Sequence, residues 1–338
     1  MTLTRNKRFS HIYVETEVMD HPRTRRILSQ FPDAGVIEID RYESIFNRSG
    51  QSYQEQFPSQ CLILAAKHGT KLYQGAPVCQ DFDNRWFYYT VPAMNCLYNC
   101  AYCWLKGMYS GADMVIFVNT EDYLTETEEL LGQHPVYLCL AYETDLVPIE
   151  NMTSLLTDWS AFTAAHEDLS VEIRTKCAAR DVWRELPVCD RIIPAFTLSP
   201  DEVVSSMERG TPSLEERLQA VRTAVECGFP VRICYDPVFR IPGWKEAYAR
   251  LVQATAEAVP MERLRDISVG TFRLSAEYMR NMRKRFPDEP VIQYPYVCEH
   301  GYYHNREADI REMEDFMVNL LTGYVPRERI FLESRESE

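Results

Sequence analysis

Apolar and polar residues follow one another along this chain in blocks that predict alternating strands and helices. From residue 85 onward, short apolar runs typical of buried strands precede longer stretches with apolar positions at helical spacing. Strands are expected at Trp86–Thr90, Met114–Val118, Val136–Leu140, Leu169–Arg174, Arg191–Phe196, Val231–Val238 and Ile267–Thr271. Helices are expected at Glu121–Leu131, Met152–His166, Ala178–Glu185, Ser213–Cys227 (with Gly228 as its stop signal), Gly243–Ala258 and Ala276–Arg285. Repeated strand–helix units predict an α/β fold with a parallel sheet, best described as an open, partial (β/α)6 TIM-like barrel. Functional residues are then expected at the carboxyl ends of the strands.

The two ends of the chain follow a different pattern. Residues 1–85 predict a small α/β region with strands at Ser10–Val14, Gly35–Glu38 and Cys61–Ala65, a helix at His21–Phe31 and a polar loop from Asn47 to Pro58. Residues 291–338 predict an α+β extension with an aromatic hairpin at Tyr294–Tyr303, an amphipathic helix at Ile310–Leu321 and a last strand at Ile330–Leu332. The chain is therefore expected to divide into 1–85, the barrel at 86–290, and 291–338.

Composition narrows the class of protein. Hydrophobic residues make up 46% and charged residues 25% of the 338 residues, which is typical of a globular protein. No apolar run approaches the roughly 20 residues that a membrane-spanning helix needs. The basic N-terminus is not followed by an apolar signal segment, so a cytoplasmic location is expected. The net charge of −14 argues against a surface covered with nucleic-acid-binding charge, although one local basic groove is compatible with it.

Three closely spaced cysteines carry the clearest chemical signal. Cys96, Cys100 and Cys103 have the spacing C-x3-C-x2-C, which lets three thiolates bind one [4Fe–4S] cluster. Such a cluster normally takes four thiolates, so three leave one iron open to a small molecule. The alternative is a set of structural or zinc-binding thiols, but zinc would need a fourth ligand nearby and no second cysteine or histidine pair follows. The eight other cysteines are scattered, and a reducing compartment suits them better than a disulfide framework.

This motif, with an aromatic residue before its third cysteine, resembles the cluster motif of the radical S-adenosylmethionine (SAM) enzymes. The resemblance implies that the open iron binds the amino and carboxylate groups of SAM. It also implies that the reduced cluster splits the sulfonium to give a 5′-deoxyadenosyl radical.

Polar residues stand at or just after the predicted strand ends. Lys176 directly follows a strand and is placed where a cation would hold a carboxylate, such as that of the methionine part of SAM. An ordinary surface lysine is the alternative. Hydroxyl groups at these ends would hydrogen-bond a ribose or a carboxylate, or else cap their strands. The strand-end set is Tyr142, Glu143, Thr144, Asp145, Thr175, Lys176, Thr197, Ser199, Asp236, Arg240 and Arg273.

Over most of its length the chain is similar to the spore photoproduct lyase family, whose members reverse a methylene-bridged thymine dimer in spore DNA. The resemblance is carried by the cysteine motif together with the segments 194–199, 208–213, 236–244, 272–273 and 285–287. It implies that Cys96, Cys100 and Cys103 ligate the cluster, and that Lys176, Thr144 and Thr197 contact SAM. Tyr102 keeps the family's tyrosine before the last cluster cysteine. Trp104 stands where the family has a second tyrosine that binds cofactor and relays a hydrogen atom.

Two departures from the family affect the predicted chemistry. The family's hydrogen-donating cysteine, aligned on Asp145, is replaced here by Tyr142, whose phenol can also give up a hydrogen atom. A core or substrate-stacking role for Tyr142 is the alternative. Cys139 lies three residues earlier and on a regular strand would point to the opposite face. In the tail, the family's basic DNA-wedging hairpin becomes an aromatic segment with Glu299, in which Cys298 is an alternative radical-quenching thiol.

The sequence therefore predicts a radical SAM carbon–carbon lyase for DNA repair. It would use a [4Fe–4S] cluster and SAM, take DNA containing a thymine-dimer lesion as its partner, and accept electrons from a donor such as flavodoxin or ferredoxin. Arg280, Arg283, Lys284 and Arg285 are candidates for a basic edge that contacts phosphates, or else for a solvated helix face. One rival is a radical enzyme on the same scaffold with another nucleobase, nucleoside or small molecule as substrate. Another is a non-catalytic iron–sulfur or zinc scaffold.

Overall fold

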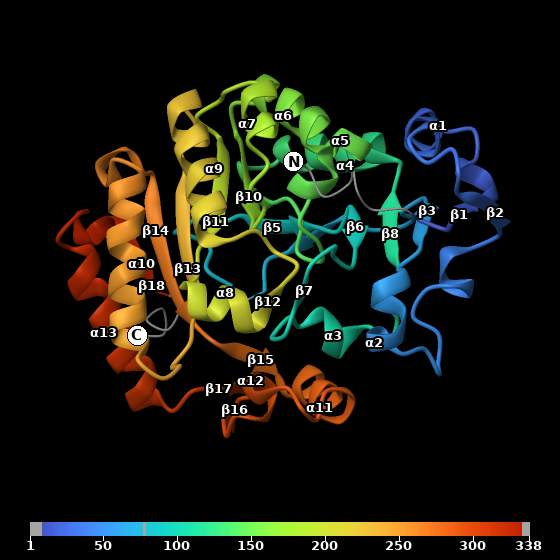
Figure 1. The fold of residues 1–338 in the computed structure, drawn as a ribbon. Coiled ribbons are helices and arrows are strands. Elements are labelled where there is room, and N and C mark those ends of the chain that lie inside the picture. The colour runs from blue at the N-terminus through green and yellow to red at the C-terminus, as the bar shows by residue number, and fades with distance from the viewer. Residues whose placement is uncertain (1–8, 77–78, 333–338) are drawn as a thin grey trace.

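Six parallel strands, adjacent in chain order, form the centre of the larger sheet (Figure 1). The computed structural model describes residues 9–76 and 79–332, so the basic N-terminus discussed above lies outside the described residues. The six strands are β5 (Phe87–Thr90), β9 (Val136–Cys139), β10 (Leu169–Thr175), β11 (Ile192–Thr197), β13 (Arg232–Val238) and β14 (Asp266–Thr271). β18 (Ile330–Leu332) extends the sheet in parallel beside β14, and β4 (Leu72–Gln74) closes the other edge antiparallel to β5. The predicted α/β fold with a partial (β/α)6 barrel is confirmed.

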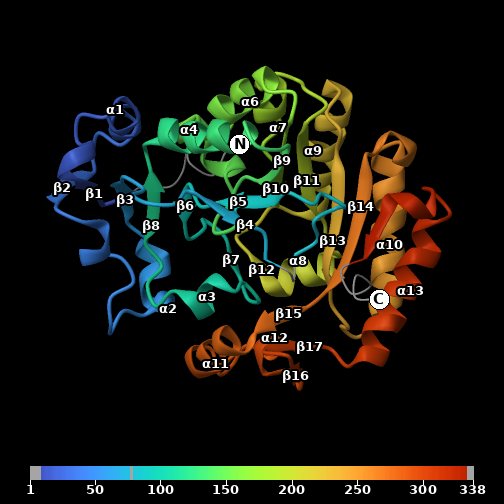
Figure 2. The same ribbon diagram turned by 180° about the vertical axis from the view of Figure 1, so that it is seen from behind.

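Helices connect these strands and pack along the outer side of the sheet (Figures 1 and 2). They are α4 (Thr120–Leu131), α6 (Leu155–Ala165), α7 (Arg180–Glu185), α9 (Leu214–Cys227), α10 (Trp244–Ala258) and α13 (Glu307–Leu321). Helix α9 illustrates how the sequence sets the limits. Ser213 and Glu216 form a reciprocal capping box at its start, and Gly228 ends it with a φ of 95°, a backbone conformation that favours glycine.

The N-terminal region forms a second sheet, in the order β2 (Gly35–Ile39), β1 (His11–Glu15), β3 (Leu62–Ala65), β8 (Met114–Phe117) and β6 (Ala93–Met94). The strand predicted at Met114–Val118 is therefore present, but it pairs with β3 and not with the barrel strands. All four β8 residues are buried, so their apolar pattern fits either sheet and does not identify the neighbour. The division of the chain at residues 85 and 290 stays a prediction.

Two local predictions were wrong. The expected loop from Asn47 to Pro58 contains a short helix, α2 (Tyr53–Gln56), whose first turn is capped by Ser52. The single helix expected at Met152–His166 is two helices, α5 (Glu150–Thr153) and α6, because Ser154 between them adopts a left-handed conformation with φ 55°. The helix expected at His21–Phe31 is confirmed as α1 (Pro22–Ser29), with proline at its first position.

Short elements gather where the barrel strands end, in the lower part of Figure 1. β7 (Asn99–Cys100) pairs with β12 (Glu208–Arg209), which follows α8 (Asp201–Met207). The predicted C-terminal hairpin is confirmed as β16 (Val297–Glu299) and β17 (Tyr302–His304), and β15 (Arg273–Ser275) pairs with β17. The same region holds α3 (Leu105–Met108), α11 (Ala276–Arg285) and α12 (Pro290–Gln293). The carboxyl ends of the barrel strands are thus covered by the segments that carry the cysteine motif and the tail.

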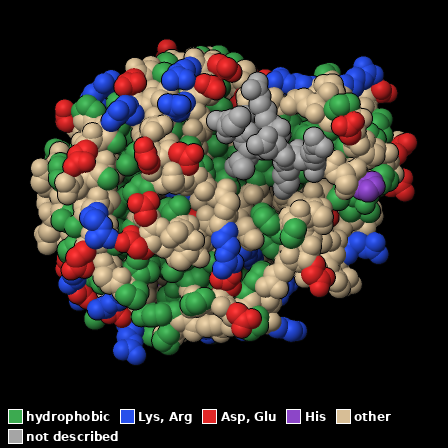
Figure 3. All heavy atoms as spheres, in the orientation of Figure 1, with side chains coloured by type: hydrophobic (Ala, Val, Ile, Leu, Met, Phe, Trp, Pro, Cys, Tyr) green, Lys and Arg blue, Asp and Glu red, His purple; other side chains and the backbone are tan. Residues whose placement is uncertain are grey.

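Charges of both signs are interspersed on the molecular face shown in Figure 3, and basic residues do not form one continuous surface there. None of the helices in the described ranges is long and apolar enough to cross a bilayer.

Two arginines of the predicted basic edge form hydrogen bonds to backbone carbonyls of the protein itself. Arg283 donates to the carbonyls of Ile292 and Tyr294, and Arg285 donates to those of Lys106 and Tyr109.

Candidate active site

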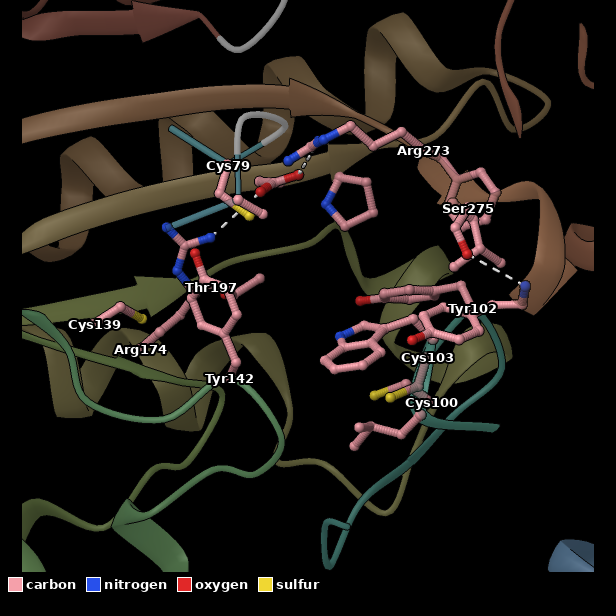
Figure 4. A pocket seen from close by; sticks show the side chains of 18 of the residues that line it. Cys79, Cys100, Tyr102, Cys103, Cys139, Tyr142, Arg174, Thr197, Arg273 and Ser275 are labelled. Carbon is pink, nitrogen blue, oxygen red and sulfur yellow. Dashed lines mark hydrogen bonds and ion pairs between the residues drawn. The ribbon is translucent and has the colours of Figure 1, made fainter. Parts of the chain in front are cut away.

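One cavity of about 790 Å³ lies among the residues at the carboxyl ends of the barrel strands, a size within the roughly 300–1,000 Å³ usual for small-molecule sites. Its wall is formed by the cysteine loop, the ends of the barrel strands, β15, the start of α11 and the turn of the C-terminal hairpin. Figure 4 shows Cys100, Cys103 and Tyr102 on one side of this pocket and Arg174, Cys139 and Tyr142 on the other. The fold thus brings residues from distant parts of the sequence to one site, as the strand-end argument predicted.

The three motif cysteines all line this pocket. The loop is fixed by its backbone: Cys100 is paired with Glu208 in the β7–β12 ladder, and the Cys103 N–H donates to the Cys100 carbonyl at 3.2 Å. The Tyr98 N–H also donates to the Cys96 sulfur at 3.4 Å. Three thiols from one short, hydrogen-bonded loop therefore face a common space.

The donor set fits an iron–sulfur cluster. Burial raises the pKa of Cys96 to about 12 and also raises those of Cys100 and Cys103, so metal binding would have to displace protons from all three thiols. In the part of the chain that the structure describes, no three cysteine, histidine or acidic side chains gather closely enough to hold one metal ion. A [4Fe–4S] cubane does not need that convergence, because each thiolate binds a different iron atom.

Lys176 provides the buried cation next to the cysteines. Burial by itself would lower the pKa of Lys176, but the negative charge of Glu208 and the neighbouring Cys100 raise it above its usual value. Its ammonium nitrogen lies 5.7 Å from the centre of the Tyr102 ring. The side chain therefore stays charged at neutral pH and can hold a carboxylate.

Asp145 holds Lys176 in place at the end of β10. Its carboxylate accepts hydrogen bonds from the Thr175 hydroxyl at 2.8 Å and from the Lys176 N–H at 2.8 Å. Thr144, next to it, also lines the pocket. Its hydroxyl oxygen is buried, and among residues 9–76 and 79–332 it has no hydrogen-bond partner. A buried hydroxyl without a protein partner at this position fits a bound ligand with polar groups.

Tyr102 has its ring in the pocket wall, but its hydroxyl donates to Glu208. Ser199 donates to the same carboxylate oxygen at 3.0 Å, and Arg217 pairs with the other oxygen at 2.6 Å. Both side chains of the Arg217–Glu208 pair are fully buried. Thr197 reaches the pocket, whereas Ser199 is not among the residues that line it and instead belongs to this network.

Trp104 also lines the pocket and stacks on Tyr278 of α11, with ring centres 5.9 Å apart. Helix α3 passes so close to α11 that a Cβ added at Gly107 would lie 2.6 Å from the Tyr278 Cβ. The indole therefore faces the pocket as part of an aromatic wall that the C-terminal region completes.

Tyr142 lies at the far end of the pocket, stacked on Tyr89 with ring centres 4.2 Å apart. Cys79 and Cys139 line the same end (Figure 4). Burial raises the pKa of Tyr142 well above its usual value, and the nearby Cys139 and Cys79 raise it further. The expectation that Cys139 faces away from Tyr142 was wrong, because β9 ends at Cys139 and the strand alternation does not continue to Tyr142.

Besides Ser199, three predicted residues do not line this pocket: Glu143, Arg240 and Cys298. Glu143 instead accepts a hydrogen bond from the Tyr109 hydroxyl. Cys298 is exposed on β16, whereas the hairpin contributes Gly301 and Tyr302 to the lining. Arg240 pairs with Asp309 and with Glu312 of α13. The roles of all the predicted site residues stay predictions.

Sequence reasoning missed several residues of the site. Glu172 and Arg174 interrupt the apolar β10 strand, and a charged pair inside a buried strand was the available signal. Cys79 gave no signal, because a lone cysteine outside a motif resembles any buried small residue.

Comparison with known proteins agrees with this arrangement. A family model described as spore photoproduct lyase matches residues 8–293. The chain belongs to the spore photoproduct lyase family. It is 21% identical over 337 residues to a spore photoproduct lyase of Geobacillus sp. (strain Y412MC61), covering 94% of this chain and 96% of that protein. It is 20% identical over 322 residues to the one of Bacillus subtilis (strain 168), covering 89% and 92%.

Solved structures show the same fold. A double mutant of spore photoproduct lyase with bound AdoMet and dinucleoside spore photoproduct matches with a TM-score of 0.83 at 19% identity, covering 97% of this chain and 99% of that one. A complex with dinucleoside spore photoproduct also matches with a TM-score of 0.83 at 19% identity, covering 96% and 98%. Family membership makes the chain a radical SAM enzyme of the spore photoproduct lyase type, and it leaves the substrate to be argued from the site.

Proposed function

We propose that this protein is a spore photoproduct lyase that cleaves the methylene-bridged thymine dimer in DNA back to two thymines. The observation that carries the proposal is the single pocket in which the three motif cysteines, Lys176 and Tyr142 face one another. Family membership supports the reaction, and the solved structures of relatives with dinucleoside spore photoproduct support the substrate.

The cofactors proposed for this pocket are a [4Fe–4S] cluster and SAM. Cys96, Cys100 and Cys103 would hold the cluster, Lys176 the carboxylate of SAM, and Thr144 and Thr197 its polar groups. When bound, the cluster and SAM supply a 5′-deoxyadenosyl radical, which abstracts a hydrogen atom from the substrate. The protein itself would position the reactants, while the cofactors supply the chemistry.

The hydrogen donor is proposed to lie in the cluster of Cys79, Cys139 and Tyr142 at the far end of the pocket. Tyr142 occupies the position of the family's donor cysteine and is the first candidate. Cys298 is exposed on β16, so a donor role there would require movement of the hairpin.

DNA would reach the pocket with the lesion flipped out of the stack, as enzymes acting on bases require. Tyr302 at the start of β17 lines the pocket and is suited to stack on a base. The electron donor, such as a flavodoxin or ferredoxin, and a cytoplasmic location stay predictions.

The test is an anaerobic assay with reconstituted, dithionite-reduced protein, SAM and dinucleotide spore photoproduct, in which thymine and 5′-deoxyadenosine are measured. We expect release of two thymines, and loss of that release in Tyr142→Phe. If thymine release survives Tyr142→Phe, then the variants Cys79→Ala, Cys139→Ala and Cys298→Ala identify the donor. Absence of 5′-deoxyadenosine from protein with an intact cluster would exclude the radical mechanism.

A second candidate function is a radical reaction on another nucleobase, nucleoside or small substrate. It is favoured by the replacement of the donor cysteine by Tyr142 and by the net charge of −14. Slow formation of 5′-deoxyadenosine without thymine release would support it. A duplex-DNA affinity measurement separates the two functions, because repair requires binding that weakens steeply with salt.

A further inference from the structure

A charged cluster of two arginines and one aspartate lies in the pocket wall, with one residue each from β10, β13 and β15. Asp236 of β13 is placed between Arg174 and Arg273. One carboxylate oxygen lies 3.4 Å from a terminal nitrogen of Arg174, and the other lies 3.6 Å from a terminal nitrogen of Arg273. All three residues line the pocket, and Figure 4 shows Arg174 and Arg273 reaching toward the same space from two sides. The polar strand ends of the sequence include Asp236 and Arg273, but the sequence alone gives no sign that the two side chains meet.

The cluster is held from behind by a buried ion network. The Arg174 Nε donates to Glu172 at 3.0 Å, and the same carboxylate accepts from Arg232 at 2.5 Å and from the Tyr137 hydroxyl at 2.6 Å. The Glu172 side chain is 2% exposed, whereas that of Arg174 is 33% exposed toward the cavity. Glu172 therefore fixes the Nε of Arg174, and the terminal nitrogens of the guanidinium group face the cavity and a ligand bound there.

The charges show which kind of ligand the cluster suits. Two guanidinium groups face two carboxylates, Asp236 and Glu172, so the cluster is formally neutral. An anion such as a phosphate would meet the Asp236 carboxylate at the centre and be repelled by it. A neutral ligand with alternating donors and acceptors has no such penalty.

The order of groups along the pocket wall is donor, acceptor, donor: Arg174, Asp236, Arg273. The imide edge of thymine or uracil has the complementary order, with a carbonyl oxygen, N3–H and a second carbonyl oxygen. Cytosine has an acceptor at N3, which would oppose the Asp236 carboxylate. Enzymes that act on flipped-out bases recognise them by hydrogen bonds to this edge.

We propose that Arg174, Asp236 and Arg273 form a recognition site for the imide edge of one pyrimidine base of the substrate. This inference rests on the proposed function and specifies which part of the lesion this wall contacts. Within this site, Arg174 lies on the same side of the pocket as Tyr142, across from Cys100 and Cys103 (Figure 4).

The test measures binding without turnover. Cluster-loaded protein with SAM and no reductant is titrated with dinucleoside spore photoproduct and with the same compound methylated at both N3 positions. Wild-type protein should bind the unmethylated compound, which keeps its N3–H groups, more tightly than the methylated one by roughly 10- to 100-fold. This factor is the usual value of a hydrogen bond to a charged group.

The variant Asp236→Asn should weaken binding of the unmethylated (N3–H) compound by a similar factor. The variant Asp236→Ala, which removes the acceptor and opens space for a methyl group, should bind the two compounds with similar affinity.

Asp158→Asn is the matched control, because Asp158 forms an ion pair with Arg23 outside the pocket. The distance between the Arg23 nitrogen and the Asp158 oxygen is 2.6 Å. It should bind both compounds as the wild type does. Thermal unfolding of each variant checks that it is folded, and the comparison of the two compounds on wild-type protein needs no variant at all. Equal wild-type affinity for the two compounds, or unchanged affinity in a folded Asp236→Asn variant, would overturn the imide site alone. Wild-type protein that binds neither compound would overturn the proposed function as well.

Discussion

The hydroxyl of Tyr102 donates its hydrogen bond to Glu208, so the phenol inside the cysteine motif is tied to a buried carboxylate and does not present its hydroxyl to the pocket. Glu208 also pairs with Arg217 and lies close enough to Lys176 to raise the pKa of that lysine. This relationship indicates a positioning role for Tyr102, in which it orders the carboxylate that keeps Lys176 charged.

The variant Tyr102→Phe should therefore affect stability more than chemistry. It removes one hydrogen bond to a buried charged group, which should lower the free energy of unfolding by roughly 1.5–3 kcal/mol. The rate of 5′-deoxyadenosine formation, measured on reconstituted protein, should stay within a few-fold of wild type. Tyr142→Phe is the informative comparison, because it should reduce thymine release while 5′-deoxyadenosine still forms. Complete loss of 5′-deoxyadenosine in Tyr102→Phe would instead assign this phenol a direct part in the reaction.

Lys176→Met should weaken SAM binding, because it replaces a charged ammonium with an apolar side chain of similar length. A lost charge-assisted contact corresponds to roughly 10- to 100-fold in the dissociation constant. Equilibrium dialysis of SAM against cluster-loaded protein measures this without turnover. Lys245→Met is the control, since Lys245 pairs with Glu312 at 2.7 Å outside the pocket. Unchanged SAM affinity in Lys176→Met would leave this lysine as a structural partner of Glu208.

Glu172→Gln should be strongly destabilising, because it leaves Arg174 and Arg232 without their shared buried counter-charge. Breaking a buried ion pair in this way costs roughly 3–5 kcal/mol. Burial tends to raise the pKa of Glu172, but Arg174 and Arg232 outweigh it and hold the pKa below its usual value. The charge therefore stabilises the fold above about pH 4.5, and this contribution is lost as the pH falls through the lowered folded-state pKa.

Denaturant unfolding at several pH values measures this effect. The difference in stability between wild type and Glu172→Gln should be large at pH 7 and should shrink below about pH 4.5. Glu307→Gln, which removes an exposed pair with Arg311, should change stability by no more than about 0.5 kcal/mol. A difference between wild type and Glu172→Gln that does not depend on pH would contradict the ionised state assigned to Glu172.

Gly107→Ala should disturb the contact between α3 and α11. The new Cβ would lie 2.6 Å from both the Cβ and the carbonyl oxygen of Tyr278, and overpacking of this kind costs roughly 1–3 kcal/mol. Because Tyr278 stacks on Trp104, the aromatic wall of the pocket should move as well, which tryptophan fluorescence would report. Gly132→Ala is the control, since its Cβ would meet no atom closer than 3.4 Å. Equal stability of Gly107→Ala and Gly132→Ala would mean that α11 shifts to accommodate the new methyl group without a loss of free energy of unfolding.

The sequence by itself determined the features that depend on near neighbours in the chain. The spacing of Cys96, Cys100 and Cys103 places three thiols on one loop whatever the rest of the fold does, and the capping box and Gly228 set the limits of α9. Repeated strand–helix units implied parallel strands, and parallel strands place their carboxyl ends at one edge. That is why Thr144, Lys176 and Thr197 could be assigned to a common site before the fold was known.

Only the tertiary structure decided which distant residues touch. Apolar periodicity shows that a strand is buried but not which strand is its neighbour, so β8 joins β3 outside the barrel. The alternation rule holds only within a strand, so it could not place Cys139 relative to Tyr142 once β9 had ended. Asp236 meets Arg174 and Arg273, and Glu208 meets Arg217 and Tyr102, through the order and register of strands. Such contacts depend on the closure of the whole sheet, and the local sequence does not encode that closure.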